Sequence, residues 1–341
     1  MTATPRPRVV ALVGPTAAGK SAAAQHLARR LGEGERSEPV GGDRLGEGER
    51  SEPVGGDRLG EGAEIVAVDA FTIYRGMDIG TATPTPQERA AVPHHLVNEL
   101  EPEQDCSAQW FQRRARRVIA EVLGRGHHAL LVGGSGLYFR AVVDPLEFPP
   151  TDREVRAAIT RRHPTAEAAF AALRVVDPAT ASRMDARNHR RAIRALEVFE
   201  LTGRPFSDWQ RSWERYEAIF PQLEVIGLDL PRETLQERIS ARVDAMLAGG
   251  LVAEAAALRD RRLSRTARAA IGYAELWDHL AGRVSLAEAR ERIIVRTRRY
   301  AARQRRWFAR DPRVRWVHST DVIEAIAERD DELHEGARLR Q

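Results

Sequence analysis

The fold of this chain is decided near its start, where residues 9–31 read VVALVGPTAAGKSAAAQHLARRL. The apolar run from Val9 to Val13 ends at a glycine, which predicts a short buried strand, and a helix is predicted from Ser21 to Leu31. Residues 14–21 match the pattern G-x-x-x-x-G-K-[ST], in which backbone amides at a helix N-terminus cradle phosphate oxygens. The stretch therefore predicts a phosphate-binding loop made of Gly14, Pro15, Thr16, Ala17, Ala18, Gly19, Lys20 and Ser21.

Lys20 is the only lysine in the sequence, although lysine and arginine together number 53. Arginine is a planar fork of five donors, whereas lysine is a compact point charge. A tight loop that needs a small ammonium group explains why lysine stands at this one position. We expect Lys20 to neutralise phosphate oxygens and the Ser21 hydroxyl to ligate Mg²⁺.

The composition is that of an ordinary globular protein, with 341 residues, 43% of them hydrophobic and 30% charged, and a net charge of +4. No apolar run reaches the roughly 18 residues that a membrane helix needs, and the first residues lack the apolar core of a signal peptide. The single cysteine, Cys106, excludes an intramolecular disulfide and a cysteine-cluster zinc site. We therefore expect a cytoplasmic protein without a membrane partner, and we expect a monomer.

Further buried strands are predicted at 64–68, 129–132, 223–228 and 314–317, with helical segments between them. Strands that alternate with helices indicate a parallel sheet, so the predicted fold class is α/β. From Asp144 onward prolines mark a boundary, and only helical segments follow until about Arg211. We predict a P-loop NTPase-like core in two parts, 1–143 and 216–320, an all-helical insertion domain at 144–215 and a tail at 321–341.

A tandem repeat interrupts the first part of the core. Residues 31–44 read LGEGERSEPVGGDR, and residues 45–58 read the same again. Such a composition cannot bury enough apolar surface to offset the entropy of ordering. We predict a flexible insertion at 32–62 and expect deletion of residues 33–60 to leave activity intact.

Asp69 follows the second predicted strand, and an acid at the carboxyl end of a strand lies in the crevice where such folds bind ligands. A typical P-loop ATPase closes a different buried strand with an aspartate that holds the Mg²⁺ shell. Here the strand 129–132 ends instead in Gly133-Gly134-Ser135-Gly136. This difference argues against a kinase or an ATPase, and the kinase stays an alternative.

Seven blocks in order along the chain resemble the tRNA dimethylallyltransferase family. The resemblance spans roughly 9–310 apart from the repeat, and it implies a P-loop core with a helical insertion domain. It also implies transfer of a dimethylallyl group from its diphosphate to the exocyclic amine of the adenosine just 3′ of the tRNA anticodon. The blocks are GPTAAGKS at 14–21, VDAFTIYRGMDIGTATP at 68–84, VGGSGLYFR at 132–140, RAIRALEVF at 191–199, RISARVDAML at 238–247, IGY at 271–273 and RQRRWF at 303–308.

The resemblance implies roles for individual residues. Asp69 matches a general base that takes a proton from the adenine amine, and Arg242 matches a ligand of the diphosphate. Ser135 matches a residue that helps to place the adenine or the diphosphate. These three and Lys20 are the expected catalytic residues, with Mg²⁺ as the expected cofactor.

A second set of residues is expected to contact the tRNA anticodon stem-loop. On the predicted C-terminal helix, six arginines from Arg292 to Arg310 are spaced 4, 3, 4, 3 and 4 residues apart, which keeps them on one face. The alternative for such a face is a solvated surface paired with acids. The resemblance implies RNA contacts by Asp69, Ala70, Phe71, Thr72, Ser135, Arg156, Arg190, Arg191, Arg194, Gly272, Tyr273, Arg303, Gln304, Arg306 and Trp307.

The chain departs from the family pattern at Ala70, Thr72, Thr83 and Arg306, where serine, glutamine, lysine and threonine are usual. These departures bear on anticodon preference more than on the reaction. Two further alternatives stay open at this point. One is an enzyme that prenylates free adenine nucleotides, and the other is a non-catalytic RNA-binding protein that uses the loop as an anion site.

Overall fold

The computed structural model describes residues 8–33 and 62–318 of the chain. Most of the predicted insertion at 32–62, and the tail predicted at 321–341, therefore lie outside the described residues. The chain divides into two compact units. One comprises Val143–Ile219, and the other combines the parts of the chain before and after it.

The larger unit is built on a parallel sheet, which confirms the predicted α/β class. In the described part of this unit the strand order is β3-β2-β4-β1-β5-β6, and each neighbouring pair is parallel. Only β3 was not predicted, because two residues are too few to show an apolar pattern. The strands are β1 (Val9–Val13), β2 (Ala63–Ala67), β3 (His94–His95), β4 (His128–Val132), β5 (Glu224–Asp229) and β6 (Val314–His318).

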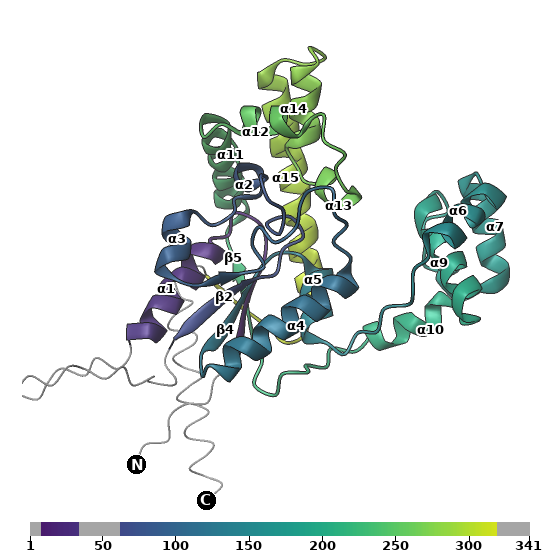
Figure 1. The fold of residues 1–341 in the computed structure, drawn as a ribbon, viewed down its shortest axis with the longest axis horizontal. Helices are drawn as coiled ribbons and strands as arrows, with labels where there is room; N and C mark the ends of the chain where they lie inside the picture. The colour runs from purple at the N-terminus through teal and green to yellow at the C-terminus, as the bar shows by residue number, and fades with distance from the viewer. Residues whose placement is uncertain (1–7, 34–61, 319–341) are drawn as a thin grey trace, which may run out of the picture. The chain divides into compact units, whose positions relative to one another are not determined.

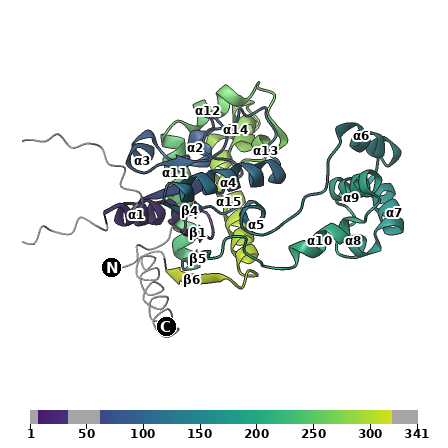
Figure 2. The same cartoon turned by 60° about the horizontal axis from the view of Figure 1, so that its bottom comes forward.

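Helices cover both faces of this sheet (Figures 1 and 2). The chain crosses from β1 to β2 in one direction and from β2 to β4 in the other, so right-handed crossovers place α1 and α4 on opposite faces. Leu12 and Leu130 of the strands are buried against Leu27 of α1. The helices of this unit are α1 (Lys20–Glu33), α2 (Asp78–Thr81), α3 (Pro86–Ala91), α4 (Ala108–Gly124), α5 (Gly136–Val143), α11 (Arg232–Ala248), α12 (Leu251–Leu258), α13 (Arg265–Arg268), α14 (Tyr273–Leu280) and α15 (Leu286–Phe308).

Helix α15 is the longest of these helices, and its ends follow from its sequence. Ser285 caps the first turn and forms a reciprocal capping box with Glu288. Ile293 and Phe308 lie on its buried face. The helix ends at Phe308, slightly before the predicted end near Arg310.

The unit Val143–Ile219 contains helices and no strand in the described structure. Its helices begin at polar caps, such as Asp152 before the first helix and Asn188 before the central one. Its ends lie side by side, because the Ile219 amide donates a hydrogen bond to the Val143 carbonyl at 2.8 Å. The helices are α6 (Arg153–Arg162), α7 (Ala166–Val176), α8 (Pro178–Ser182), α9 (His189–Thr202), α10 (Phe206–Gln210) and the 3₁₀ helix η1 (Arg211–Trp213).

Among the described helices, none is both long and apolar enough to cross a membrane.

Candidate active site

The phosphate-binding loop connects β1 to α1 with the geometry that its glycines permit. Gly14 has φ +132°, and a Cβ there would lie 2.7 Å from the carbonyl oxygen of Leu228, at the end of β5. Gly19 also has positive φ, and α1 begins at the next residue. The first amides of α1 have no partner within the helix, so they are available to an anion.

The Lys20 side chain folds back onto the phosphate-binding loop to which it belongs. Its Nζ donates hydrogen bonds to the carbonyl oxygens of Gly14 at 3.1 Å and Pro15 at 2.7 Å. Burial and, to a smaller extent, the positive charge of Arg242 lower the pKa of Lys20 to about 7, and the negative charge of Asp69 opposes both effects. A bound phosphate would supply the negative charge that this ammonium lacks.

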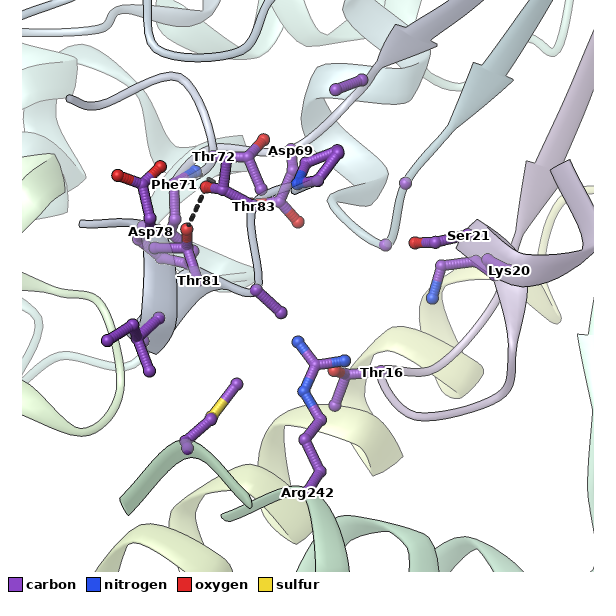
Figure 3. Close-up of a pocket in the computed structure, with 18 of the residues that line it drawn as sticks. Thr16, Lys20, Ser21, Asp69, Phe71, Thr72, Asp78, Thr81, Thr83 and Arg242 are labelled. Carbon is purple, nitrogen blue, oxygen red and sulfur yellow. Dashed lines mark hydrogen bonds between the residues drawn. The ribbon is translucent and has the colours of Figure 1, made fainter. Parts of the chain in front are cut away.

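A cavity of about 760 Å³ opens beside this loop (Figure 3). Figure 3 shows Thr16, Lys20 and Ser21 on one side of it and Asp69 on the other, with Arg242 reaching in from α11. The structure thus brings together residues that are far apart in sequence. Among the predicted site residues, those that line the cavity are Thr16, Lys20, Ser21, Asp69, Phe71, Thr72, Arg242 and Gln304.

Asp69 stands in the loop after β2, at the carboxyl edge of the sheet. Its carboxylate accepts a hydrogen bond from the Phe71 amide at 2.8 Å, which fixes its direction. Burial raises the pKa of Asp69, while this hydrogen bond and the charges of Lys20 and Arg242 act to lower it. A raised pKa makes the carboxylate a stronger base, as proton abstraction requires.

Arg242 projects from α11 into the same cavity (Figure 3). Burial lowers the pKa of Arg242, and the guanidinium makes no ion pair with another described residue. Arg238, one turn earlier on α11, lines a smaller hollow of about 260 Å³ beside Lys20 and Ser21. The sequence analysis missed Arg238, although its spacing of four residues from Arg242 places both on one helix face.

The cavity also has an apolar side. Ile239, Val243 and Met246 of α11 line it, together with Ile79 and Ile293. Tyr300 of α15 lines it as well, and burial raises the pKa of this phenol, so it stays protonated.

Only part of the turn after β4 lines the cavity. Gly133 and Gly134 line the cavity, but Ser135 does not. A Cβ at Gly133 would lie 1.9 Å from the carbonyl oxygen of Val68, so close packing of two strand ends explains this glycine. A catalytic part for Ser135 stays a prediction.

Glu254 is a further residue that sequence reasoning missed. Its carboxylate accepts hydrogen bonds from the amides of Ile79 at 2.8 Å and Gly80 at 2.9 Å, at the start of α2. The Tyr273 hydroxyl donates to the same carboxylate at 2.8 Å. Tyr273 is fully buried, so its side chain does not reach the surface where RNA was expected to meet it, and Gly272 serves as the cap of α14. No local pattern in the sequence connects Glu254 to α2.

The predicted RNA-binding arginines of the insertion unit fall into two groups. Arg156 and Arg194 both pair with Glu197, at 2.8 and 3.0 Å, and this carboxylate is fully buried. Arg190 and Arg191 are exposed at the start of α9. The pairing shows that Arg156 and Arg194 hold the unit together, and RNA contact by them is a prediction beyond that role.

The arginine face of α15 divides in the same way. Arg292 and Arg296 pair with acids of α14, namely Asp278 at 3.4 Å and Glu275. Towards the end of the helix Arg303 and Arg306 are exposed. Trp307 is also exposed, at 43%. Among the six arginines of this face, the alternative of acid pairing therefore holds for Arg292 and Arg296. Off this face, near the end of the helix, Arg305 also pairs with an acid, Asp229.

The residues at the cavity fit the expected Mg²⁺. Magnesium is commonly held by one or two protein oxygens together with substrate phosphates, not by a complete protein cage. The Ser21 hydroxyl and the Asp69 carboxylate both line the cavity. Within residues 8–33 and 62–318, no group of three or more histidine, cysteine, aspartate or glutamate side chains is placed to hold a metal ion.

Fold and site together define a P-loop protein in which the phosphate-binding loop, the Asp69 carboxylate and the Arg242 guanidinium line one cavity. The IPP transferase family profile matches residues 72–311. A relative from Bifidobacterium longum, named tRNA dimethylallyltransferase, is 45% identical over 315 residues, covering 92% of this chain and 87% of the relative. The chain belongs to the IPP transferase family.

Two more comparisons agree with this assignment. A relative of the same name from Nocardioides is 43% identical over 322 residues, covering 93% of each chain. The crystal structure of a tRNA isopentenylpyrophosphate transferase from Bacillus halodurans matches with a TM-score of 0.64 and 33% identity, covering 98% of this chain and 99% of that one. The expected family and fold are thus confirmed.

Proposed function

We propose that this protein transfers a dimethylallyl group from dimethylallyl diphosphate to the exocyclic amine of the adenosine 3′ to the anticodon in tRNA. Membership of the IPP transferase family makes it a tRNA prenyltransferase. One observation carries the proposed geometry: Lys20, Arg242 and Asp69 line a single cavity. A cradle for the leaving diphosphate and a base for the attacking amine are therefore in one space.

The reaction breaks the C–O bond between the allylic carbon and the diphosphate and forms a C–N bond to adenine. The exocyclic amine is a weak nucleophile because its lone pair is delocalised into the ring. Asp69 takes its proton as the new bond forms, a contribution of about 10²- to 10⁴-fold. The proton ends on the Asp69 carboxylate and the electron pair of the broken bond on the diphosphate.

The donor lies across the polar and apolar sides of the cavity. Lys20, Arg242 and the loop amides bind the diphosphate, where negative charge grows as the bond breaks. The apolar side, with Ile239, Val243 and Met246, suits the five-carbon chain. Mg²⁺ held by Ser21 and phosphate oxygens would supply further positive charge for the leaving group.

The acceptor is a base in a folded RNA and must leave its stack, which costs a few kcal/mol and least in a loop. The anticodon stem-loop is therefore the proposed substrate. The exposed Arg190, Arg191, Arg303 and Arg306 are the groups we assign to its phosphates. We propose that the protein acts as a monomer, in the cytoplasm where tRNA is found.

A transfer assay tests this function. Purified protein, Mg²⁺ and labelled dimethylallyl diphosphate are mixed with unmodified tRNA, with AMP, or with no acceptor. We expect label on tRNA only, mapped to the adenosine beside the anticodon. Label on AMP alone would keep the chemistry and remove the RNA substrate. No label from folded protein, with ATP turnover in its place, would support the kinase.

A further inference from the structure

Gln304 lies on the buried face of α15 and bridges two loops of the phosphate site. Its side-chain oxygen accepts a hydrogen bond from the Thr16 amide at 2.8 Å, and its side-chain nitrogen donates to the Gly134 carbonyl at 3.0 Å. The Thr16 amide can only donate and the Gly134 carbonyl can only accept, so a glutamine amide satisfies both at once. The side chain is only 5% exposed, so water competes little for either bond.

On the side of the β4–α5 turn, the lack of a side chain at Gly134 leaves room for the Gln304 side chain. A Cβ at Gly134 would lie 2.1 Å from the Gln304 side-chain nitrogen and 3.2 Å from the carbonyl oxygen of Gly14. Any larger residue at 134 would therefore push the amide of Gln304 away. The absence of a side chain there lets α15, the turn and the phosphate-binding loop approach one another.

The bond to Thr16 acts at a strained point of the loop. The next residue, Ala17, has φ +66°, which is uncommon for a residue with a Cβ. Holding the Thr16 amide fixes the direction in which the chain enters this conformation. The contact thereby supports the stretch of loop between Thr16 and the start of α1 at Lys20.

We propose that Gln304 is a positioning residue for the diphosphate, and not a contact for RNA. It holds the phosphate-binding loop in its binding shape from a helix that also carries the exposed Arg303 and Trp307. The proposal rests on the proposed function only in requiring that this loop binds diphosphate. It goes further by giving the donor site a supporting residue, Gln304, that is 288 residues away from Thr16 in the sequence.

The test is Gln304→Met, which keeps the length of the side chain and removes both hydrogen bonds. We expect the Kd for inorganic diphosphate with Mg²⁺, measured by calorimetry, to rise about tenfold, as loss of one to two net hydrogen bonds implies. The KM for dimethylallyl diphosphate should rise equally, while kcat and the KM for tRNA stay unchanged. A role that merely stabilises the fold would not produce this separation.

Two pairs of variants make the test independent of one substitution. Gly134→Ala should weaken diphosphate binding in the same way, whereas Gly124→Ala is its control, since nothing lies within 4 Å of a Cβ at 124. Ala302→Gln, on the exposed side of α15, is the control for Gln304→Met. Thermal unfolding of each variant identifies any that fails to fold. If Gln304→Met does not fold, the glycine pair decides.

Unchanged diphosphate affinity in Gln304→Met, with a raised KM for tRNA, would overturn the proposal and restore the RNA contact. Equal affinity in Gly134→Ala and Gly124→Ala would also overturn it. The failure of the proposed function is a different result: wild-type protein would bind diphosphate but transfer no label to tRNA. In that case the affinity measurements still decide the role of Gln304.

Discussion

Three charged side chains at the cavity control one another's protonation. Lys20 and Arg242 are two cations in a partly buried space, and each pKa is lowered chiefly by burial. Asp69 is the anion that partly compensates them, and burial raises its own pKa. In the free protein, the single negative charge of Asp69 therefore compensates the two buried positive charges only in part. A diphosphate relieves this imbalance, so the same electrostatics that strain the free protein favour its ligand.

Asp69→Asn tests the base. The amide keeps the size and the bond from the Phe71 amide but cannot take a proton. We expect kcat to fall by about 10²- to 10⁴-fold, with tRNA and diphosphate affinities close to wild type. In wild type, activity should also fall at low pH as the raised pKa of Asp69 is crossed, and this acid limb should vanish in the variant. Near-wild-type turnover of Asp69→Asn would remove Asp69 as the base.

Lys20 predicts a pH dependence for diphosphate binding. Its pKa in the free protein is about 7, and a bound diphosphate must raise it. Below that pH the ammonium is already charged, so binding takes up no proton there. Above it, binding must bring a proton to Lys20, and affinity falls by up to about tenfold per pH unit until the pKa of the bound state is reached.

The measurement is a calorimetric titration with inorganic diphosphate and Mg²⁺ between about pH 6 and pH 9, a range that includes the Lys20 pKa of about 7. Lys20→Met serves as the control, because the pH dependence that it retains belongs to the ligand. Parallel curves for the two proteins would contradict the prediction.

The Lys20→Arg variant should bind diphosphate weakly at every pH, since the planar guanidinium does not fit where a compact ammonium donates hydrogen bonds to two loop carbonyls.

Among the elements, α2 depends most clearly on its surroundings. It is a single turn of four residues, and such a short helix is not stable by itself. Glu254 of α12 accepts from two of its first amides, and Tyr273 of α14 orients that carboxylate. The segment they hold supplies Asp78, Ile79 and Thr81 to the cavity lining. Two helices thus shape the side of the cavity opposite the phosphate-binding loop.

Glu254→Gln tests this arrangement. A glutamine has one acceptor oxygen, so one amide of α2 would face an NH₂ group. We expect the free energy of unfolding to fall by about 2 kcal/mol, and by about 1 kcal/mol in Tyr273→Phe, both measured by urea denaturation. The double variant should lose less than the sum, because both residues act on the same bonds. Additive losses would show that Tyr273 does not act through Glu254.

The elements also show which features sequence can predict. The four inner strands of the sheet, such as Val9–Val13 and His128–Val132, are mostly apolar runs that end at or near a glycine or a polar residue, and sequence patterns detect such runs. The phosphate-binding loop and Asp69 follow directly from strand ends. Glu254 and the orientation of Gln304 do not, since their partners lie in distant segments and only the fold brings them together.

Arginines gave the least certain sequence signal. Spacing places Arg292 to Arg310 on one face of α15, but it does not show which of them meet acids on α14. For Arg194 a signal was present, because Glu197 follows at i+3 and can pair with it. Arginine spacing alone could not separate groups that stabilise the fold from groups that are exposed to a ligand.

At the scale of the whole molecule, the chain divides its tasks between two units. The residues that line the cavity all lie outside Val143–Ile219. The smaller unit has its own core around Ile159, Leu173 and Ile193, and its buried Glu197 ties Arg156 to Arg194. Each unit therefore contains the contacts that hold it together, and the cavity should form without the smaller one.

Excision of the smaller unit tests this division. The bond from the Ile219 amide to the Val143 carbonyl, at 2.8 Å, shows that a short glycine-serine linker can replace the residues between them. We expect the shortened protein to fold, by circular dichroism, and to bind inorganic diphosphate as the whole protein does. Transfer to tRNA should be lost, because Arg190 and Arg191 are removed with α9. If the shortened protein folds but binds no diphosphate, the donor site depends on the smaller unit. If it still modifies tRNA at the full rate, the RNA-binding surface lies entirely on the larger unit.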